Sequence, residues 1–346
     1  MGGTPHKGHY YLNLEVLKEK WRLSEGLQEG RYNYPEDANR PPFFIAQFEP
    51  STHDDAQETT RLLIETELRV YPDWMFRDLI KIPKLPVSAS KEYTLKVNNV
   101  EQGNWNVILA DDKPCLMYDI GTNAYGSSVS QDIQRQLRNH PFTNDVEALF
   151  ISHWHADHFN ILTGMNAAEL KRIKQFVCTT SLNCLTEFNI LLWFRLHRST
   201  QICMVNHPAK EKWQSVPLVS GHLNMYVRRY VKSNPNNAGL LLFFKGMSDC
   251  VTLTGDANYS TIQEVSKDGI SKLNCKGGYN MIAPHHGGHA GSFTCSVDDV
   301  IKKEAIISVG ANNPYHHPDK QVERRLKQSF LQVSKTSEEG DVTMSL

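Results

Sequence analysis

The sequence lacks the features that define several large classes of protein. Its seven cysteines are an odd number and contain no Cys-x-x-Cys pair, so neither a disulfide framework nor a cysteine-bound zinc site is expected. We predict reduced, mostly buried thiols. Positive charge is not in excess either, because 37 Lys and Arg face 38 Asp and Glu. No overall field therefore draws the protein to nucleic acid or to an anionic membrane. A polyanionic substrate would have to be held by a local patch or by metal ions.

Long apolar segments are also missing. The richest apolar run, residues 190–194, is far shorter than the roughly 20 residues that span a bilayer. The first residues contain no apolar stretch followed by a cleavage site, which is the pattern of a secretory signal. We therefore expect a soluble, cytoplasmic protein that makes no contact with a membrane.

The first 90 residues differ in character from the rest. Residues 12–27 and 54–71 have helical patterns, and a Pro- and Asn-rich connection at 31–44 resists regular structure. We predict that residues 1–90 form a partly helical N-terminal extension with no recognisable motif. Three roles stay open for it: packing on the following domain, assembly, or binding a protein partner.

From about residue 91 the chain consists of short β-rich runs broken by turns. Strands at 94–97 and 106–109 predict a hairpin, which a third strand follows at 115–118. Further strands are predicted at 146–152, 176–179, 201–205, 223–231, 240–244, 250–254, 280–283 and 305–309, with helices at 128–138, 181–197, 259–267, 296–303 and 318–330. Strands that alternate with helices in both halves indicate an α/β protein with sheets sandwiched between helices. We assign this domain to residues 91–335 and predict a polar tail at 336–346.

The strongest chemical signal is a cluster of metal-type side chains directly after an apolar strand. The strand ends at Ser152, and His153, His155, Asp157 and His158 follow within six residues. A loop after a strand can turn several of these side chains inward together. Imidazole nitrogen and carboxylate oxygen are ligands that suit Zn²⁺ or Mn²⁺. The spacing offers two nitrogen ligands to one metal and a nitrogen–oxygen pair to a neighbouring one.

Two distant strand ends carry ligands of the same kind. A buried-looking strand at 251–254 runs into Gly255 and Asp256, and another at 280–283 runs into His285 and His286 followed by two glycines. Glycines permit the backbone to approach a ligand closely. Because three strand ends carry metal-type ligands, we expect them to converge on one site.

These motifs resemble a known superfamily. The His-x-His-x-Asp-His cluster, with a later Gly-Asp and a later His, is similar to the metallo-β-lactamase superfamily. The opening hairpin at 95–122 with Asp119-Ile-Gly121, the stretch 237–240, Pro-His-His-Gly-Gly at 284–288 and the segment 307–318 more narrowly resemble the soluble relatives of the ComEC C-terminal hydrolase domain. The resemblance covers about residues 94–330. It implies a metallo-β-lactamase αββα sandwich.

The resemblance also implies roles for individual residues. Two divalent ions, Zn²⁺ or Mn²⁺, would be held by His153 and His155 (metal 1), by Asp157, His158 and His286 (metal 2), and by Asp256 between them. We place Asp157, His285 and His317 in the catalytic machinery. His285 would face the substrate as proton donor or phosphate ligand, and His317 would line the same pocket. Asp119 would hold the metal loop through hydrogen bonds.

The chain departs from the superfamily pattern in two places. Members commonly supply a third histidine to metal 1, for which the candidates here are His197, His207 and His222. We favour His222, which lies at a Gly-His turn before a strand, or no third ligand at all. The opening turn at 98–104 also differs from the usual Val-Gly-Gln-Gly-Asp, which places substrate contacts from that turn in question.

The function that the resemblance implies is metal-dependent hydrolysis by a phosphodiesterase or nuclease. A hydroxide activated by two metals would attack phosphorus in line, and His285 or His317 would protonate the departing alkoxide. Nucleic acid or another phosphodiester would be the substrate. Three alternatives stay open: an enzyme for another ester, such as a phosphorylcholine-type ester; an effector hydrolase gated by a protein partner that binds residues 1–90; and a metal-binding scaffold without catalysis.

Overall fold

The computed structural model describes the chain from residue 79 to the C-terminus and three short strands before it. The described ranges are 79, 81–88, 90–124, 129–181, 185–197, 199–230, 235–291, 300–311 and 313–346, with the backbone alone at 9–13, 28–30 and 43–47. The three strands, β1 (His9–Asn13), β2 (Gln28–Gly30) and β3 (Phe43–Gln47), form an antiparallel sheet in the order β1-β3-β2. The predicted helix at 12–27 is therefore wrong for residues 12 and 13. Residues 14–27 and the helix predicted at 54–71 lie outside the described residues.

A seven-stranded sheet contains the N-terminal half of the main domain. Its order is β17-β4-β5-β6-β7-β8-β9. The strands are β4 (Tyr93–Val97), β5 (Asn106–Ala110), β6 (Lys113–Tyr118), β7 (Ala148–Phe150), β8 (Gln175–Thr179), β9 (Gln201–Val205) and β17 (Val342–Ser345). The predicted hairpin is present, since β4, β5 and β6 pair antiparallel. From β6 to β9 the strands are parallel.

A second seven-stranded sheet contains the C-terminal half, in the order β10-β11-β12-β13-β14-β15-β16. The strands are β10 (Trp213–Val219), β11 (Leu223–Arg228), β12 (Leu240–Lys245), β13 (Cys250–Leu253), β14 (Gly278–Ile282), β15 (Ile301–Ile307) and β16 (Gln332–Lys335). Strands β10 to β13 pair antiparallel, and β13 to β16 pair parallel. Each sheet thus joins an antiparallel part to a parallel part.

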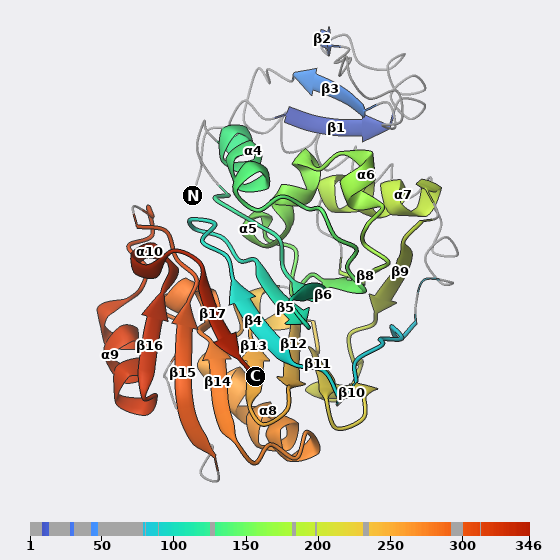
Figure 1. Ribbon diagram of the computed structural model, residues 1–346. Coiled ribbons are helices and arrows are strands. Elements are labelled where there is room, and N and C mark those ends of the chain that lie inside the picture. The colour runs from blue at the N-terminus through green and yellow to red at the C-terminus, as the bar shows by residue number, and fades with distance from the viewer. Residues whose placement is uncertain are drawn as a thin grey trace.

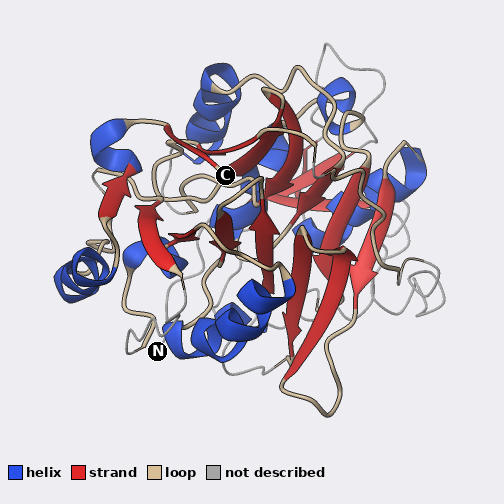
Figure 2. Ribbon diagram, turned by 60° about the horizontal axis from the view of Figure 1, so that its bottom comes forward, coloured by secondary structure: helices blue, strands red, loops and turns tan. Residues whose placement is uncertain are grey.

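Helices cover the outer faces of the two sheets. They are α4 (Val129–Asn139), α5 (Ala156–Phe159), α6 (Ala167–Leu170), α7 (Leu185–His197), α8 (Tyr259–Lys272), α9 (Lys320–Ser329) and α10 (Thr336–Glu339), with the 3₁₀ turns η1 (Asn160–Gly164), η2 (Pro235–Ala238) and η3 (Pro284–Gly287). The strands lie between the helical layers in two views (Figures 1 and 2). Strand β1 of the small sheet lies against α7 (Figure 1).

Three apolar clusters show the order of the layers. One cluster joins the two sheets and includes Leu95 and Leu242. A second lies between the first sheet and its helices, with the rings of Phe176 and Phe194 4.8 Å apart, and a third lies between the second sheet and α8 and α9 and includes Phe243 and Ile262. Central strands bury both faces, which explains their continuous apolar runs. The predicted αββα sandwich is confirmed.

Two local predictions need correction. Residues 301–303, predicted as the end of a helix at 296–303, begin strand β15, while residues 292–299 lie outside the description. The predicted polar tail at 336–346 instead contains α10 and β17, and β17 pairs with β4. Val342 and Met344 face the core between polar neighbours. A four-residue alternation is too short to distinguish a strand from a tail until its partner strand is known.

The thiols differ from the prediction at one pair. Cys250 and Cys275 form a disulfide with a Cα–Cα distance of 6.1 Å. Cys250 begins β13 and Cys275 precedes β14, and the parallel pairing of these strands brings the two residues together. Spacing along the chain does not reveal this. Cys115, Cys178 and Cys203 are reduced and buried as predicted.

Among the described residues, no helix is both long enough and apolar enough to cross a membrane.

Candidate metal centre

The predicted ligands all leave the carboxyl ends of strands. The loop with His153 to His158 follows β7, Asp256 follows β13, and the histidine pair of η3 follows β14. Parallel neighbours place their carboxyl ends on the same edge of a sheet, which is where α/β proteins bind ligands. The two sheets pack with these edges adjacent: Leu240 N donates to Ser152 O across them at 2.8 Å.

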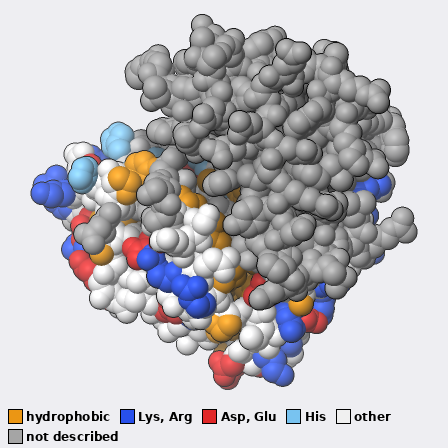
Figure 3. Space-filling view, turned by 90° about the horizontal axis from the view of Figure 1, so that it is seen from above, with side chains coloured by type: hydrophobic (Ala, Val, Ile, Leu, Met, Phe, Trp, Pro, Cys, Tyr) orange, Lys and Arg blue, Asp and Glu red, His pale blue; other side chains and the backbone are white. Residues whose placement is uncertain are grey.

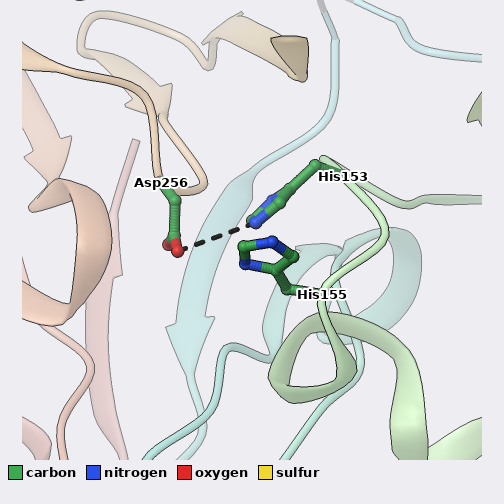
Figure 4. Close-up of side chains that lie close together, drawn as sticks. All are labelled: His153, His155 and Asp256. Atoms are coloured by element: carbon green, nitrogen blue, oxygen red, sulfur yellow. Dashed lines mark ion pairs between the residues drawn. The ribbon is translucent and has the colours of Figure 1, made fainter. Parts of the chain in front are cut away.

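The first ligand group joins His153, His155 and Asp256, whose ligand atoms all lie within 4.8 Å of one another. Figure 4 shows the two imidazoles of the β7 loop facing the carboxylate from the other sheet. His153 Nε2 is 3.6 Å from Asp256 Oδ2, and the two imidazole centroids are 4.5 Å apart. His153 and Asp256 are buried, while His155 is half-buried. These are the residues predicted for metal 1.

The second group joins Asp157, His158 and His286, again within 4.8 Å. His286 Nε2 lies 3.4 Å from Asp157 Oδ2. Asp256 reaches this group too, because its Oδ1 is 3.1 Å from His158 Nε2 and 3.9 Å from His286 Nε2. Asp256 therefore lies between the two groups, in the place predicted for a bridging carboxylate.

Four buried atoms at this centre make no hydrogen bond of acceptable geometry with any residue that the structure describes: Nε2 of His153, His158 and His286, and Oδ1 of Asp256. Leaving a polar atom buried without a partner costs about 1–3 kcal/mol, so isolated cases are rare in folded proteins. Here four such atoms converge on one point. A divalent cation would satisfy all of them, and nitrogen and carboxylate oxygen are donors that suit Zn²⁺ or Mn²⁺. The side chains present fit the metal that the motif implies.

Asp119 orients the first-sheet half of the centre. It is fully buried, and its Oδ2 accepts from His158 Nδ1 at 2.8 Å and from Ser152 Oγ at 2.9 Å. Its Oδ1 accepts from Ser152 N at 2.7 Å. Because Nδ1 of His158 carries the proton toward Asp119, Nε2 points to the centre as a ligand atom. This is the holding role predicted for Asp119.

Asn104 completes this arrangement, although the sequence showed it only as a departure in the opening turn. It is buried, and its Nδ2 donates to Asp119 Oδ2 at 3.1 Å. Its backbone N donates to Asp157 O at 3.0 Å and its backbone O accepts from Gly121 N at 2.9 Å. A Cβ on Gly121 would lie 2.0 Å from Asp157 O, so only glycine permits this approach. A polar residue in a hairpin turn gave no signal for the contact.

The second-sheet half is held by backbone instead. His286 Nδ1 donates to Ser308 O at 2.9 Å, which directs its Nε2 to the centre in the same way. His285 and His286 both adopt the left-handed region, with φ of 52° and 53°. Few non-glycine residues adopt it, and such positions often lie at functional sites.

Charges at the centre suit a cation. Burial raises the pKa of Asp256, but neighbouring His158 outweighs burial and holds it well below its usual range. Burial likewise opposes ionisation of Asp157, but the imidazole of His286, 3.4 Å away, lowers its pKa to about 2. Burial, then His158, holds the pKa of His153 well below its usual range. The centre thus offers two ionised carboxylates and, at His153, a neutral imidazole. Burial opposes protonation of His158 and His286, but the carboxylates beside them raise the pKa of both, so a cation that binds here displaces protons from these two imidazoles.

His285 and His317 lie beside the ligands. His285 Nε2 is 3.9 Å from Asp256 Oδ2, and its side chain is 32% exposed. The His317 ring meets it edge to face, with centroids 5.3 Å apart. Burial, then the neighbouring imidazoles His285 and His286, lowers the pKa of His317 to about 4. Both predicted catalytic histidines therefore border the centre.

The favoured third histidine is not at the centre. His222 lies in the turn between β10 and β11, where its Nδ1 is 3.2 Å from Lys245 O. Lys245 ends β12, whereas the other end of that strand, at Leu240, borders the centre. The Gly-His turn was therefore misleading, because it lies at the opposite edge of the sheet. His207 uses both ring nitrogens elsewhere, 2.9 Å from Ser181 Oγ and 2.7 Å from Arg228 O. The side chain of His197 lies outside the description.

Comparison with known proteins supports the resemblance read from the motifs. No protein-family model matches the chain. A stretch of 110 residues, 32% of this chain, is 30% identical to ComE operon protein 3 of Bacillus subtilis (strain 168) and covers 14% of that protein. The match thus spans about a seventh of the length of that relative. This supports a ComEC-like relationship.

A solved structure is similar as well. Tm1679, described as a metal-dependent hydrolase of the β-lactamase superfamily, aligns with a TM-score of 0.42 and 11% identity over 73% of this chain and 99% of its own. So distant a likeness adds nothing to the assignment of the fold, which the layers and strand order of this chain carry. In layer order and ligand motif, the chain resembles metal-dependent hydrolases of the metallo-β-lactamase superfamily.

Proposed function

We propose that this protein is a metal-dependent hydrolase that cleaves phosphodiesters, with nucleic acid as the leading substrate. The observation that carries metal dependence is the convergence of four buried, unpartnered ligand atoms from two sheets. The phosphodiester is favoured by the ComEC-like resemblance of the motifs and of the matched stretch. The chain has a net charge of −1, so it has no overall attraction for an anionic substrate. Cations bound at the centre would supply the positive charge that a phosphodiester needs.

The chain's own groups have distinct tasks in this reaction. Divalent ions bound at such a centre lower the pKa of water and offset charge on the oxygens under attack. Asp256 and Asp157, kept ionised by their imidazole neighbours, would hold the cations. Asp119 and the Ser308 carbonyl keep the imidazoles of His158 and His286 in the orientation that binding needs.

The leaving group needs a proton, and the two histidines beside the ligands differ in how they can supply it. His317, with a pKa lowered to about 4, is neutral at pH 7 and serves as a hydrogen-bonding group. His285 has a side chain that is 32% exposed and lies 3.9 Å from the Asp256 carboxylate. We assign the role of general acid to His285 and the orientation of His285 or of the substrate to His317.

The test combines metal content with activity. Purified protein is assayed for bound metal and for cleavage of bis-p-nitrophenyl phosphate, DNA and RNA with added Mn²⁺ or Zn²⁺. We expect Asp157→Ala and His286→Ala to lose metal and to lower activity by about a thousandfold. His222→Ala is the matched control, because its imidazole lies at the opposite edge of the second sheet, and should retain both. Bound metal with hydrolysis of other esters alone would replace the phosphodiester; wild-type protein that binds no added metal would refute the whole proposal.

A further inference from the structure

Three aromatic rings lead outward from the metal centre. His285 is next to Asp256, and its ring meets the His317 ring edge to face. The His317 ring in turn stacks on Tyr315, with centroids 5.6 Å apart and planes inclined by 19°. Exposure rises along the series, from 3% for the Asp256 side chain and 32% for His285 to 43% for Tyr315. The series thus connects the bridging carboxylate to the surface.

Tyr315 is unusual among the aromatic side chains. The large exposed hydrophobic residues in the described part of the chain are Ile82, Met247, Ile301, Tyr315 and Leu331, and only Tyr315 is aromatic. Histidine and apolar side chains lie side by side on the surface of the described part, next to the residues drawn in grey (Figure 3). Tyr315 is therefore a partly exposed aromatic side chain stacked on a histidine that borders the metal centre.

The loop that carries Tyr315 is held by one side chain. Asn313 Nδ2 donates to Gly310 O at 2.9 Å and to His317 O at 2.7 Å. Its Oδ1 accepts from His317 N at 2.8 Å. The turn that contains Tyr315 is therefore closed at both ends before any substrate arrives. A ring held in place loses little freedom on binding, which favours its use as a contact surface.

We infer that Tyr315 is a stacking platform for the base that adjoins the scissile phosphodiester. The inference rests on the proposed function and names its substrate class: a nucleotide chain with an unpaired base, rather than a small phosphodiester. Aromatic stacking binds every base, since each has a flat π-face, and it does not need positive charge. A protein of balanced charge requires such a contribution, because it has no general electrostatic attraction for nucleic acid.

The experiment compares two oligonucleotides of equal length and charge. One is oligothymidylate, and the other carries abasic tetrahydrofuran sites in place of its bases. Cleavage of each is measured with wild type, Tyr315→Ala, Tyr315→Trp and Leu331→Ala. Leu331→Ala is the matched control, because it truncates an exposed apolar side chain before β16, away from the carboxyl ends of the parallel strands. Metal content and melting temperature are recorded for every variant.

We expect wild type to cleave oligothymidylate with kcat/KM about tenfold above the abasic strand, mostly through KM. Tyr315→Ala should remove that preference, because it should lower kcat/KM for oligothymidylate about tenfold more than for the abasic strand. Tyr315→Trp and Leu331→Ala should keep the preference. Equal cleavage of the two strands by wild type, or an equal loss on both in Tyr315→Ala, would refute the stacking role of Tyr315. Neither result would contradict the proposed phosphodiesterase activity. A wild-type preference for p-nitrophenyl phosphorylcholine over both strands would overturn it in favour of a choline ester, and cleavage of no phosphodiester would refute the proposed function with it.

Discussion

The two sheets contribute to the metal centre in different ways. The first sheet supplies its ligands from one loop after β7, so that His153, His155, Asp157 and His158 are neighbours along the chain. The second sheet supplies Asp256 and His286 from loops after two different strands. The first half is therefore recognisable as a local motif, whereas the second exists only because β13 and β14 lie side by side. The position that joins both halves, Asp256, comes from the half with the weaker sequence signal.

The orientation of the ligands differs between the halves as well. On the first sheet a side chain, Asp119, fixes His158. On the second sheet a backbone carbonyl, that of Ser308, fixes His286. A substitution of Asp119 removes the first interaction. A substitution of Ser308 leaves the second in place, because it does not change the backbone carbonyl. The two halves should therefore respond differently to mutation, although both use the same hydrogen-bond geometry at Nδ1.

The largest effect is expected for Asp256→Asn. The carboxylate lies 3.6 Å from His153 Nε2 and 3.1 Å from His158 Nε2, so its charge serves both ligand groups. We expect the variant to lose metal from both groups and to lower kcat/KM by about a thousandfold. Mass spectrometry of bound metal and a phosphodiesterase assay measure the two effects.

His155→Ala, which alters one group only, should keep metal at the other. Asp249→Asn is the control for a buried second-sheet carboxylate, since Asp249 is ion-paired with Lys303 at 2.7 Å and should retain full metal content. Full metal content in Asp256→Asn would show that Asp256 does not join the halves.

A smaller effect is expected at the residues that orient the imidazoles. Asp119→Ala removes three hydrogen bonds that hold His158 and Ser152, and we expect metal affinity to fall by about 10- to 100-fold. Ser308→Ala keeps the carbonyl that holds His286 and loses only the bond from Oγ to Gly103 O. Its affinity should change by no more than about twofold. Competition with a chelator measures both, and equal losses in the two variants would refute the contrast between side chain and backbone.

The smallest effect concerns the cysteines, which also differ between the sheets. The first sheet contains the buried thiols Cys115, Cys178 and Cys203, and the second contains the Cys250–Cys275 disulfide. Burial, then the nearby carboxylate of Glu147, raises the pKa of Cys115 to about 11 from its ordinary value of 9.0. Because the folded pKa is raised, the contribution of Cys115 to stability is complete below pH 9 and is lost as pH rises toward 11.

Cys115→Ala should therefore reduce the fall in unfolding free energy between pH 8.5 and 11 by about 1–2 kcal/mol. Urea unfolding at the two pH values measures this difference for wild type and variant. The lost packing lowers stability of the variant at both pH values alike, so it cancels in the comparison. An unchanged pH dependence would show that the Cys115 thiol ionises as readily in the folded state as in the unfolded one.

Much of the fold could be predicted from local patterns. Strands such as β6 and β12 bury most of their side chains, and their continuous apolar runs are visible in the sequence. Elements with weak patterns were missed: β10 has Val216 as its one buried residue, and β17 has only Val342 and Met344 as buried positions. Such strands form because a neighbouring strand offers hydrogen bonds, which the pattern of the strand itself cannot show.

The chemistry of the centre was determined by the sequence alone. The choice of His and Asp, their spacing after β7, and the recurrence of ligands at two later strand ends are local properties, because a ligand's identity and its place at a strand end do not depend on distant contacts. The six proposed ligands and His285 could be named on that ground, whereas His317 and the assignment of ligands to individual metals came from the resemblance to the superfamily.

Only the tertiary structure decided which of these atoms meet. His222 lies at the edge of its sheet opposite the metal centre, and Asn104 donates a hydrogen bond to Asp119. Cys250 and Cys275 form a disulfide. Tyr315 stacks on His317 at the surface. Each of these contacts joins residues whose proximity depends on strand pairing or on a loop turning back, because register and loop closure are fixed by the packing of the whole domain rather than by neighbours along the chain.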